Sequence, residues 1–326
     1  MTRRFASSLV VCGIAAVVLS LLPFTLSGLN RVTAAKVGLY FIAILGLNIL
    51  TGYTGQISIG HGAFMAIGGY TTAIMSQDHH TNLIATLPLS FAITFGAGVI
   101  VGLPASRLSG VYLALATLAL AVSVPQFTLK FSSFLGARNG IHLADNVSDI
   151  WLYGVSWSCA AILFVAGWLL LRGRTGRAFR AIRDSEVAAA SSGVSLVLYK
   201  TLAFGISAAF AGVAGSLFVM ANLGYAQPDE FSILLSLNIL IGAAVAGLGS
   251  LWGVGAGAAL IALLPNISQN APFIGQGHDP VVVGVVVILV VLLLPTGFAG
   301  LLHRGLRGVA ARRNRRPGGI SQPETR

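Results

Sequence analysis

The chain has 326 residues, of which 56% are hydrophobic and only 9% are charged, whereas an average soluble domain is about 25% charged. So few charges cannot cover the surface of a soluble protein, and the composition therefore predicts an all-α polytopic membrane protein. The net charge of +11 does not indicate nucleic-acid binding, because the Lys and Arg residues lie in short loops and tails between apolar runs, as the positive-inside rule expects.

Ten apolar segments follow one another, several of them close to the length of a spanning helix. The first comes after Arg3 and Arg4, as in a signal peptide, but it is long and no small-x-small cleavage site follows, so we expect an uncleaved helix. Ten membrane segments become eight if two of the glycine-rich ones are re-entrant. The segments cover residues 8–28, 35–51, 57–76, 83–104, 109–129, 151–171, 200–221, 231–248, 250–268 and 281–300.

The stretch "ILTGYTGQISIGHGAF", Ile49 to Phe64, interrupts the second and third segments. Its glycines at 52, 55, 60 and 62 argue against one continuous helix from 35 to 76. In hydrocarbon, a broken backbone is tolerated only where it is buried in protein or lines a cavity. We therefore expect this glycine-rich block to face the interior of the bundle.

Two interpretations of the block stay open. In the first, the glycines let helices pack closely and the hydroxyls satisfy backbone groups. In the second, a half-helix starts here and its free N–H groups attract a solute carboxylate. Ionisable groups inside a membrane are usually functional, and one histidine lies in a predicted span. On the second interpretation, the substrate path is lined by Tyr53, Gln56, Ser58, His61 and Thr117.

Residues 172–199 form the longest polar stretch between two spans. Its alanines favour a helix, and Phe179, Ile182 and Val187 mark a narrow apolar stripe. Gly193 is placed to end that helix. A short helix with one apolar and one basic edge suits docking into a groove of another protein; a basic loop that only fixes topology is the alternative.

The basic edge of this stretch consists of Arg177, Arg180 and Arg183, which recur at every third residue. Arg180 is spaced to meet Asp184 at i,i+4.

The end of the chain, 303–326, is a basic tail with six arginines between His303 and Arg316. We expect it to be disordered and to meet anionic lipid, which leaves 1–302 as the membrane domain. Alternating the segments from a cytoplasmic N-terminus puts 16 of the Lys and Arg residues inside and 4 outside. This asymmetry predicts that both termini and the 172–199 stretch are cytoplasmic.

A short internal echo is also present, because residues 47–50 and 237–240 both read "LNIL" and both lead into glycine-rich sequence. Transporters often contain repeats with interrupted helices at matching places. Chance is the alternative in so apolar a chain.

The loop "GRAFRAIRDSEVAAASSGVSLVLYK" resembles the coupling segment of ABC-importer permeases, in which a Glu-Ala-Ala…Gly pattern meets an ATPase subunit. It is most similar to the LivM-like permease subunits of branched-chain amino acid importers. Four further blocks resemble the same family in the same order, at 46–74, 103–120, 247–265 and 293–302. Ala190 is a departure, since the family commonly has an acid there.

The resemblance implies the transmembrane permease subunit of an ABC importer in a bacterial inner membrane, moving leucine, isoleucine and valine into the cytoplasm. The partners it implies are a second permease subunit in a heterodimer, two ABC ATPase subunits and a periplasmic or extracellular solute-binding protein. Urea or amides, which the same family handles, are the alternative substrates. Coupling to the ATPase is assigned by the resemblance to Arg177, Arg180, Arg183, Asp184, Glu186 and Gly193.

Some chemistry is missing from the sequence. It contains no G-x-x-x-x-G-K-[ST] motif, so the chain cannot hydrolyse ATP unaided, and the energy for transport must come from a partner or an ion gradient. No histidine pair has metal-ligand spacing with a carboxylate on one helix face, and we expect no catalytic residue, metal or cofactor. None of the nine acids lies mid-span, which argues against a stand-alone secondary carrier. Backbone carbonyls can bind Na⁺, so that alternative stays open.

Overall fold

The computed structural model describes residues 28–79, 81–130, 140–143, 147–222 and 224–269, with a few single positions between 284 and 300. Apart from one short antiparallel pair, β1 (Ile141–His142) with β2 (Tyr225–Ala226), the regular structure in these ranges is helical. The first predicted segment, most of the tenth and the basic tail at 303–326 lie outside the described residues.

Eight of the helices coincide with the second to ninth predicted segments. The stretch that follows the sixth segment forms two further helices, α8 and α9. In chain order they are α2 (Gly28–Leu47), η1 (Asn48–Tyr53), α3 (His61–His79), α4 (Leu83–Ala105), α5 (Val111–Lys130), α7 (Asp149–Arg172), α8 (Arg174–Asp184), α9 (Glu186–Ser191), α10 (Leu196–Ala221), η3 (Pro228–Phe231), α11 (Ile233–Ala246) and α12 (Val254–Gln269).

Five of the described helices are long and apolar enough to cross a membrane, which confirms a polytopic helical membrane protein. They cover Asn30–Tyr53, Leu83–Ala105, Val111–Thr128, Asp149–Arg172 and Leu196–Ala221. Two shorter apolar helices, Ile233–Ala246 and Val254–Pro265, accompany them. The 19-residue α3 belongs to neither group, because glycines and polar side chains dilute its apolar residues. The count of ten segments stays a prediction.

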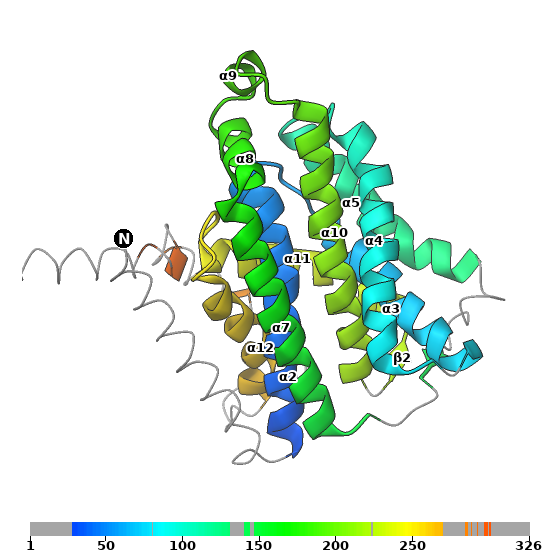
Figure 1. Cartoon of the computed structure of the whole chain (residues 1–326). Helices are drawn as coiled ribbons and strands as arrows, with labels where there is room; N and C mark the ends of the chain where they lie inside the picture. Colours follow the sequence, from blue (N-terminus) through cyan, green and yellow to red (C-terminus); the bar gives the residue numbers. More distant parts are fainter. Residues whose placement is uncertain are drawn as a thin grey trace, which may run out of the picture.

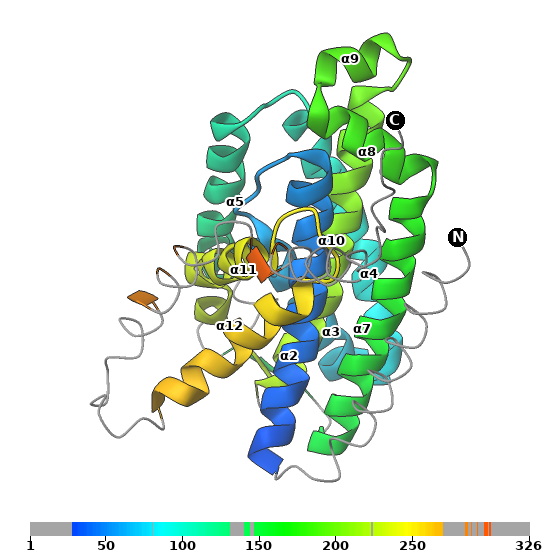
Figure 2. The ribbon, with the colours of Figure 1, turned by 90° about the vertical axis from the view of Figure 1, so that its left-hand side faces the viewer.

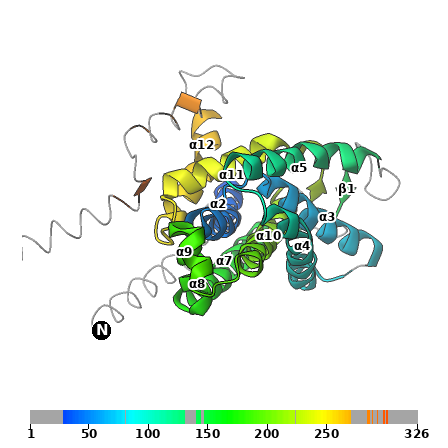
Figure 3. The ribbon, with the colours of Figure 1, turned by 90° about the horizontal axis from the view of Figure 1, so that it is seen from above.

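Helix α10 occupies the centre of the bundle. Seen from above, it lies beside α2, between a row that contains α5 and α11 and a row that contains α4 and α7 (Figure 3). It contacts α2, α3 and α4 most extensively. Small residues allow this closeness, as at Gly212, where an added Cβ would collide with the Thr94 side chain. Membrane helices that pack tightly commonly use small residues in this way.

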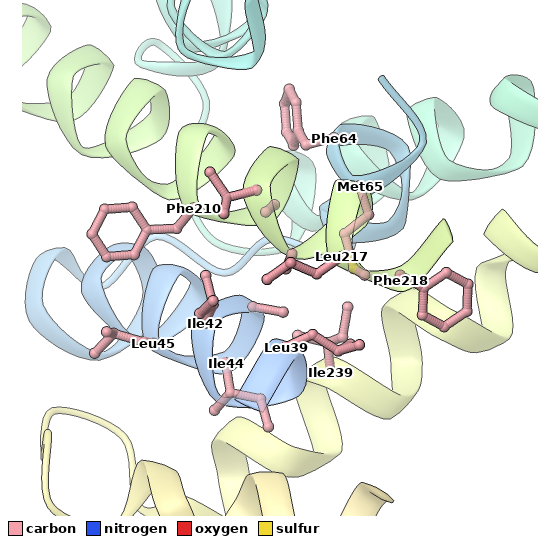
Figure 4. Close-up of a cluster of buried hydrophobic side chains, with 14 of the residues drawn as sticks. Leu39, Ile42, Ile44, Leu45, Phe64, Met65, Phe210, Leu217, Phe218 and Ile239 are labelled. Atoms are coloured by element: carbon pink, nitrogen blue, oxygen red, sulfur yellow. The ribbon is translucent and has the colours of Figure 1, made fainter. Parts of the chain in front are cut away.

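The apolar core joins α2, α3, α10 and α11 (Figure 4). Leu39 and Ile42 of α2 face Leu217 of α10, and all three side chains are fully buried. Between α3, α4 and α10 the contact is partly polar, because the Ser90 and Ser216 hydroxyls both donate to one backbone carbonyl at 3.1 Å. Such interhelical hydrogen bonds help to fix the relative position of membrane helices.

The connections alternate between two ends of the bundle. Figures 1 and 2 show α8 and α9 at one end, and Figure 1 shows β2 toward the other. The C-terminal part of α4 lies at the α8 end, where the Thr201 hydroxyl at the start of α10 donates to the Gly102 carbonyl at 3.4 Å. At the other end, η3 packs against α5 and β1 packs against α3. Within the described ranges these connections agree with the alternation predicted from the charges; the sides of the membrane and the segments beyond these ranges stay predictions.

Candidate functional site

The glycine-rich block forms a broken helix. Helix α2 runs without interruption into the π-helix η1, and the chain leaves helical structure after Thr54. Gly55 has a φ of +76°, a backbone conformation that a residue with a Cβ seldom adopts. Residues 55–60 are irregular, and α3 begins at His61. The predicted break is confirmed, but α3 starts four residues later than the expected 57, and the π-helix was not foreseen.

Side-chain hydroxyls satisfy the backbone of the break. The Thr51 hydroxyl donates to the Gln56 carbonyl at 3.0 Å. The Ile59 N–H donates to the Thr117 hydroxyl, and the Gly62 N–H donates to the Ser236 hydroxyl, each at 2.9 Å. Because several single bonds from different helices replace a continuous helical ladder, this segment is held less uniformly than the helices around it.

The predicted path residues are buried in this conformation, except Tyr53, which is half-buried. Gln56, Ser58, His61 and Thr117 each have at most 5% of their surface exposed. Within the described ranges, Gln56 Oε1 and both ring nitrogens of His61 have no hydrogen-bond partner. Buried polar atoms of this kind are uncommon in proteins.

These residues contact different parts of the bundle. Thr117 lies against the Ile59–Gly60 backbone. Gln56 instead faces α10, where its Nε2 donates to the Lys200 carbonyl at 3.4 Å. His61 faces α2, since its Nε2 would be 3.5 Å from a Cβ placed on Gly46. These three contacts therefore involve three different helices, and the Gly62 N–H adds a fourth, α11.

The stretch after α7 is two helices rather than one. Ser185 is extended, with φ of −163° and ψ of 115°, and its hydroxyl caps α9 by accepting the Ala188 N–H at 3.3 Å. Gly193 ends α9 with a φ of +82°. The N–H groups of Gly193 and Val194 bond back to the Ala190 and Ala189 carbonyls, each at 3.0 Å. This is the Schellman arrangement, which confirms Gly193 as the stop.

The predicted apolar stripe is wrong at one position. Phe179 and Ile182 are buried, and Phe179 meets Tyr199 of α10 edge to face. Val187 is 79% exposed, because the break at Ser185 turns α9 away from the face of α8 that packs. The buried pair therefore anchors α8 to its own bundle, and Val187 is the exposed member of the predicted stripe.

The predicted Arg180–Asp184 pair does not form. Arg180 Nη1 donates to the Leu171 carbonyl at 3.2 Å, because helical side chains lean toward the N-terminus and the last carbonyls of α7 lack helical partners. Asp184 lies 3.8 Å from Arg183 instead, with both side chains substantially exposed. Arg177 is exposed, as a docking role requires.

Sequence reasoning missed two polar residues that join these segments. Asn48 in η1 is fully buried, accepts the Gly249 N–H at 2.8 Å and donates to the Ser250 carbonyl at 2.7 Å. Lys200 at the start of α10 forms a 2.7 Å ion pair with Glu186. An amide or an ammonium inside an apolar run is the signal that could have revealed both. Among the described residues, no cluster of three His, Cys, Asp or Glu side chains could hold a metal ion.

The comparison with known proteins now decides the family. Residues 31–295 match the family described as the permease component of branched-chain amino acid transport systems. The chain belongs to this family. As a permease component it is a transport subunit that spans the membrane several times, and ATP-powered partners are implied by the family.

Relatives of this permease agree with the assignment. The high-affinity branched-chain amino acid permease protein LivM of Salmonella typhimurium is 30% identical over 319 residues, which covers 87% of this chain and 73% of the relative. LivM of Escherichia coli is 29% identical over the same shares. LivH of Escherichia coli is 24% identical, over 80% of this chain and 91% of its own. No solved structure gives a significant match.

Proposed function

We propose that this permease moves leucine, isoleucine and valine inward across a bacterial inner membrane. In this proposal it pairs with a second, different permease subunit, two ABC ATPase subunits and an external solute-binding protein. The observation that supports the ATPase contact is the exposed α8–α9 segment, whose outer surface combines Arg177 with Val187. An apolar anchor with a basic rim suits a groove in a partner. The family and the LivM and LivH relatives support the solute class.

The broken segment is the proposed part of the solute path. A solute with a carboxylate is attracted by the first N–H groups of a helix, and α3 begins at His61 within the bundle. Because Gln56 and His61 are buried here, the path opens in this proposal only when α2 and α10 move relative to the break. Buried polar atoms without partners supply hydrogen-bonding capacity for that open state.

Uptake in proteoliposomes that contain the complete complex tests this function. Gln56→Leu and His61→Phe should lower leucine uptake while leaving assembly and ATPase binding normal. Loss of assembly would instead favour the packing interpretation of the block. Competition with isoleucine, valine and urea separates the amino acid role from the urea and amide alternative. Uptake by the chain alone, without ATPase subunits, would indicate a secondary carrier.

The docking proposal has its own test. Val187→Glu and Arg177→Glu should each reduce co-purification of the ATPase subunits, because they place an acid on the exposed surface of α8–α9. Val197→Glu is a matched control, since Val197 is also exposed but lies beyond Gly193 in the first turn of α10. Equal loss in all three variants would contradict a specific role for α8–α9.

A further inference from the structure

The side chain of Arg183 turns from the end of α8 toward the broken helix. Its Nη1 donates to the Gly52 carbonyl at 2.7 Å, across 131 residues of sequence. A Cβ on Gly55 would lie 3.3 Å from Arg183 Cγ, and a Cβ on Gly249 would lie 2.7 Å from Nη1. Arg183 therefore occupies a place that two glycines leave open, Gly55 of the break and Gly249 of the α11–α12 turn, and it binds the carbonyl of a third, Gly52.

The carbonyl that Arg183 binds lies in the last turn of η1, where backbone carbonyls lack helical partners. Bonds from a charged donor to such a carbonyl are stronger than those between neutral groups. The same turn of η1 is tied to Gly249 and Ser250 through Asn48. Arg183 thus meets η1 close to the point where the α11–α12 turn is already attached to it.

Glu186 makes a second link from this stretch to the break. It pairs with Lys200, and the Lys200 carbonyl accepts the Gln56 amide. The α8–α9 stretch is therefore joined to the broken segment at two points on either side of Ser185, to Gly52 by Arg183 and to Gln56 through Glu186 and Lys200. Arg177, one and two-thirds turns earlier on α8, is exposed and makes neither contact.

We propose that Arg183 is a positioning residue that transmits movement of α8 to the break at 52–60, and not a residue that touches the ATPase. The proposal rests on the proposed function, because it needs a partner that moves α8. A shift of α8 then acts directly on the Gly52 carbonyl and on the backbone of Gly55. The break can follow, because it is held by single hydroxyl bonds rather than by a helical ladder.

The experiment uses the full complex in proteoliposomes and compares Arg183→Ala, Arg183→Lys and Arg177→Ala. Three quantities are measured: ATPase subunit retained, ATP hydrolysed and leucine imported. Arg183→Ala should retain the ATPase but lower leucine imported per ATP by about tenfold, the effect of losing one charged hydrogen bond. Arg183→Lys should recover part of this, because an ammonium can still donate to Gly52. Arg177→Ala should mainly lower ATPase retention.

Hydrogen exchange of the purified full-length chain gives a second readout that does not depend on partners. Arg183→Ala should speed exchange at 50–60 relative to Arg177→Ala, and Arg183→Lys should lie between them. Unchanged exchange there, or unchanged leucine per ATP with the ATPase bound, would overturn the proposal. Loss of ATPase equal to that of Arg177→Ala, with normal import per ATP, would also overturn it. If the unmodified complex imports no leucine, the proposed function fails, and exchange alone decides the role of Arg183.

Discussion

Glu186 and Lys200 form an ion pair of 2.7 Å that joins α9 to the first turns of α10. The Lys200 side chain is only 4% exposed, whereas that of Glu186 is 46% exposed. The carboxylate of Glu186 therefore compensates the charge of the buried Lys200 ammonium. The same pair holds the connection from 186 to 200 against the bundle.

Removing the charge of Glu186 should destabilise the protein. Glu186→Gln leaves the buried ammonium of Lys200 without its carboxylate, and we expect a loss of about 1–3 kcal/mol in the free energy of unfolding. The value should fall near the lower limit, because Glu186 is half exposed to water. Thermal unfolding in nanodiscs measures it. Asp184→Asn is the control, since its 3.8 Å pair with Arg183 is exposed and surface pairs contribute about 0–1 kcal/mol. Equal effects of the two variants would contradict this account.

Replacing Asn48 by leucine should release η1 from the α11–α12 turn. The variant removes both hydrogen bonds to Gly249 and Ser250 and leaves a buried N–H and carbonyl unpaired, each costing about 1–3 kcal/mol. Asn238→Leu is the matched control, because Asn238 has the same place in the second Leu-Asn-Ile-Leu run and is less buried. We expect unfolding temperature to fall for Asn48→Leu only. A similar drop in both variants would mean that the change of residue type alone is responsible.

Gly52 should not tolerate even a methyl group. A Cβ there would overlap the Asn48 side chain and the Gly249 backbone, so Gly52→Ala must displace η1 or the α11–α12 turn. We expect reduced folded yield and loss of transport. Gly96→Ala in α4 is the control, because nothing lies within 4 Å of its Cβ; there alanine should leave the yield unchanged or raise it. Normal yield and transport for Gly52→Ala would show that the contact is looser than described.

Glu230 in η3 should make stability depend on pH. Burial raises the pKa of its carboxyl, against the opposing effects of a hydrogen bond with Asn222 and the charge of Lys36. A carboxyl whose pKa is higher in the folded state binds its proton more tightly there, so stability falls as pH rises from the unfolded value of about 4.3 through the folded one. Glu230→Gln should match the wild type at pH 4 and unfold at a higher temperature at pH 7.5. An identical pH slope for both proteins would contradict this.

The break and the helix stop were predictable from local chemistry. Glycine disfavours a helix, and the chain leaves helical structure just before Gly55, although Gly52 lies inside η1. Gly193 has the conformational freedom that a helix end requires. The membrane class followed from composition, since too few charges are present to cover a soluble surface. These properties depend on neighbouring residues or on the whole chain, so no distant contact was needed to infer them.

Contacts between distant segments were not predictable in the same way. Charge at i,i+4 spacing suggested Asp184 as a partner for Arg180, but its guanidinium donates instead to the carbonyl of Leu171 at the end of α7. Arg183 and Val187 were both placed on a docking surface. Val187 is exposed, whereas the half-exposed Arg183 side chain also reaches back to the Gly52 carbonyl. Which way each side chain points depends on the extended residue at 185 and on how α8 rests on the bundle.

The central position of α10 shows that the hydropathy of a helix and its exposure outside the chain are separate properties. Its span and that of α4 have the same mean hydropathy, yet α10 is almost wholly enclosed by this chain and α4 is largely exposed. A change in bilayer thickness acts on helices in contact with lipid, which respond by tilting. Thicker or thinner membranes should therefore change the tilt of α4, α5 and α7, which are exposed, and leave the tilt of the enclosed α10 unchanged. Bilayer thickness would then alter the outer helices of this permease without moving its central helix.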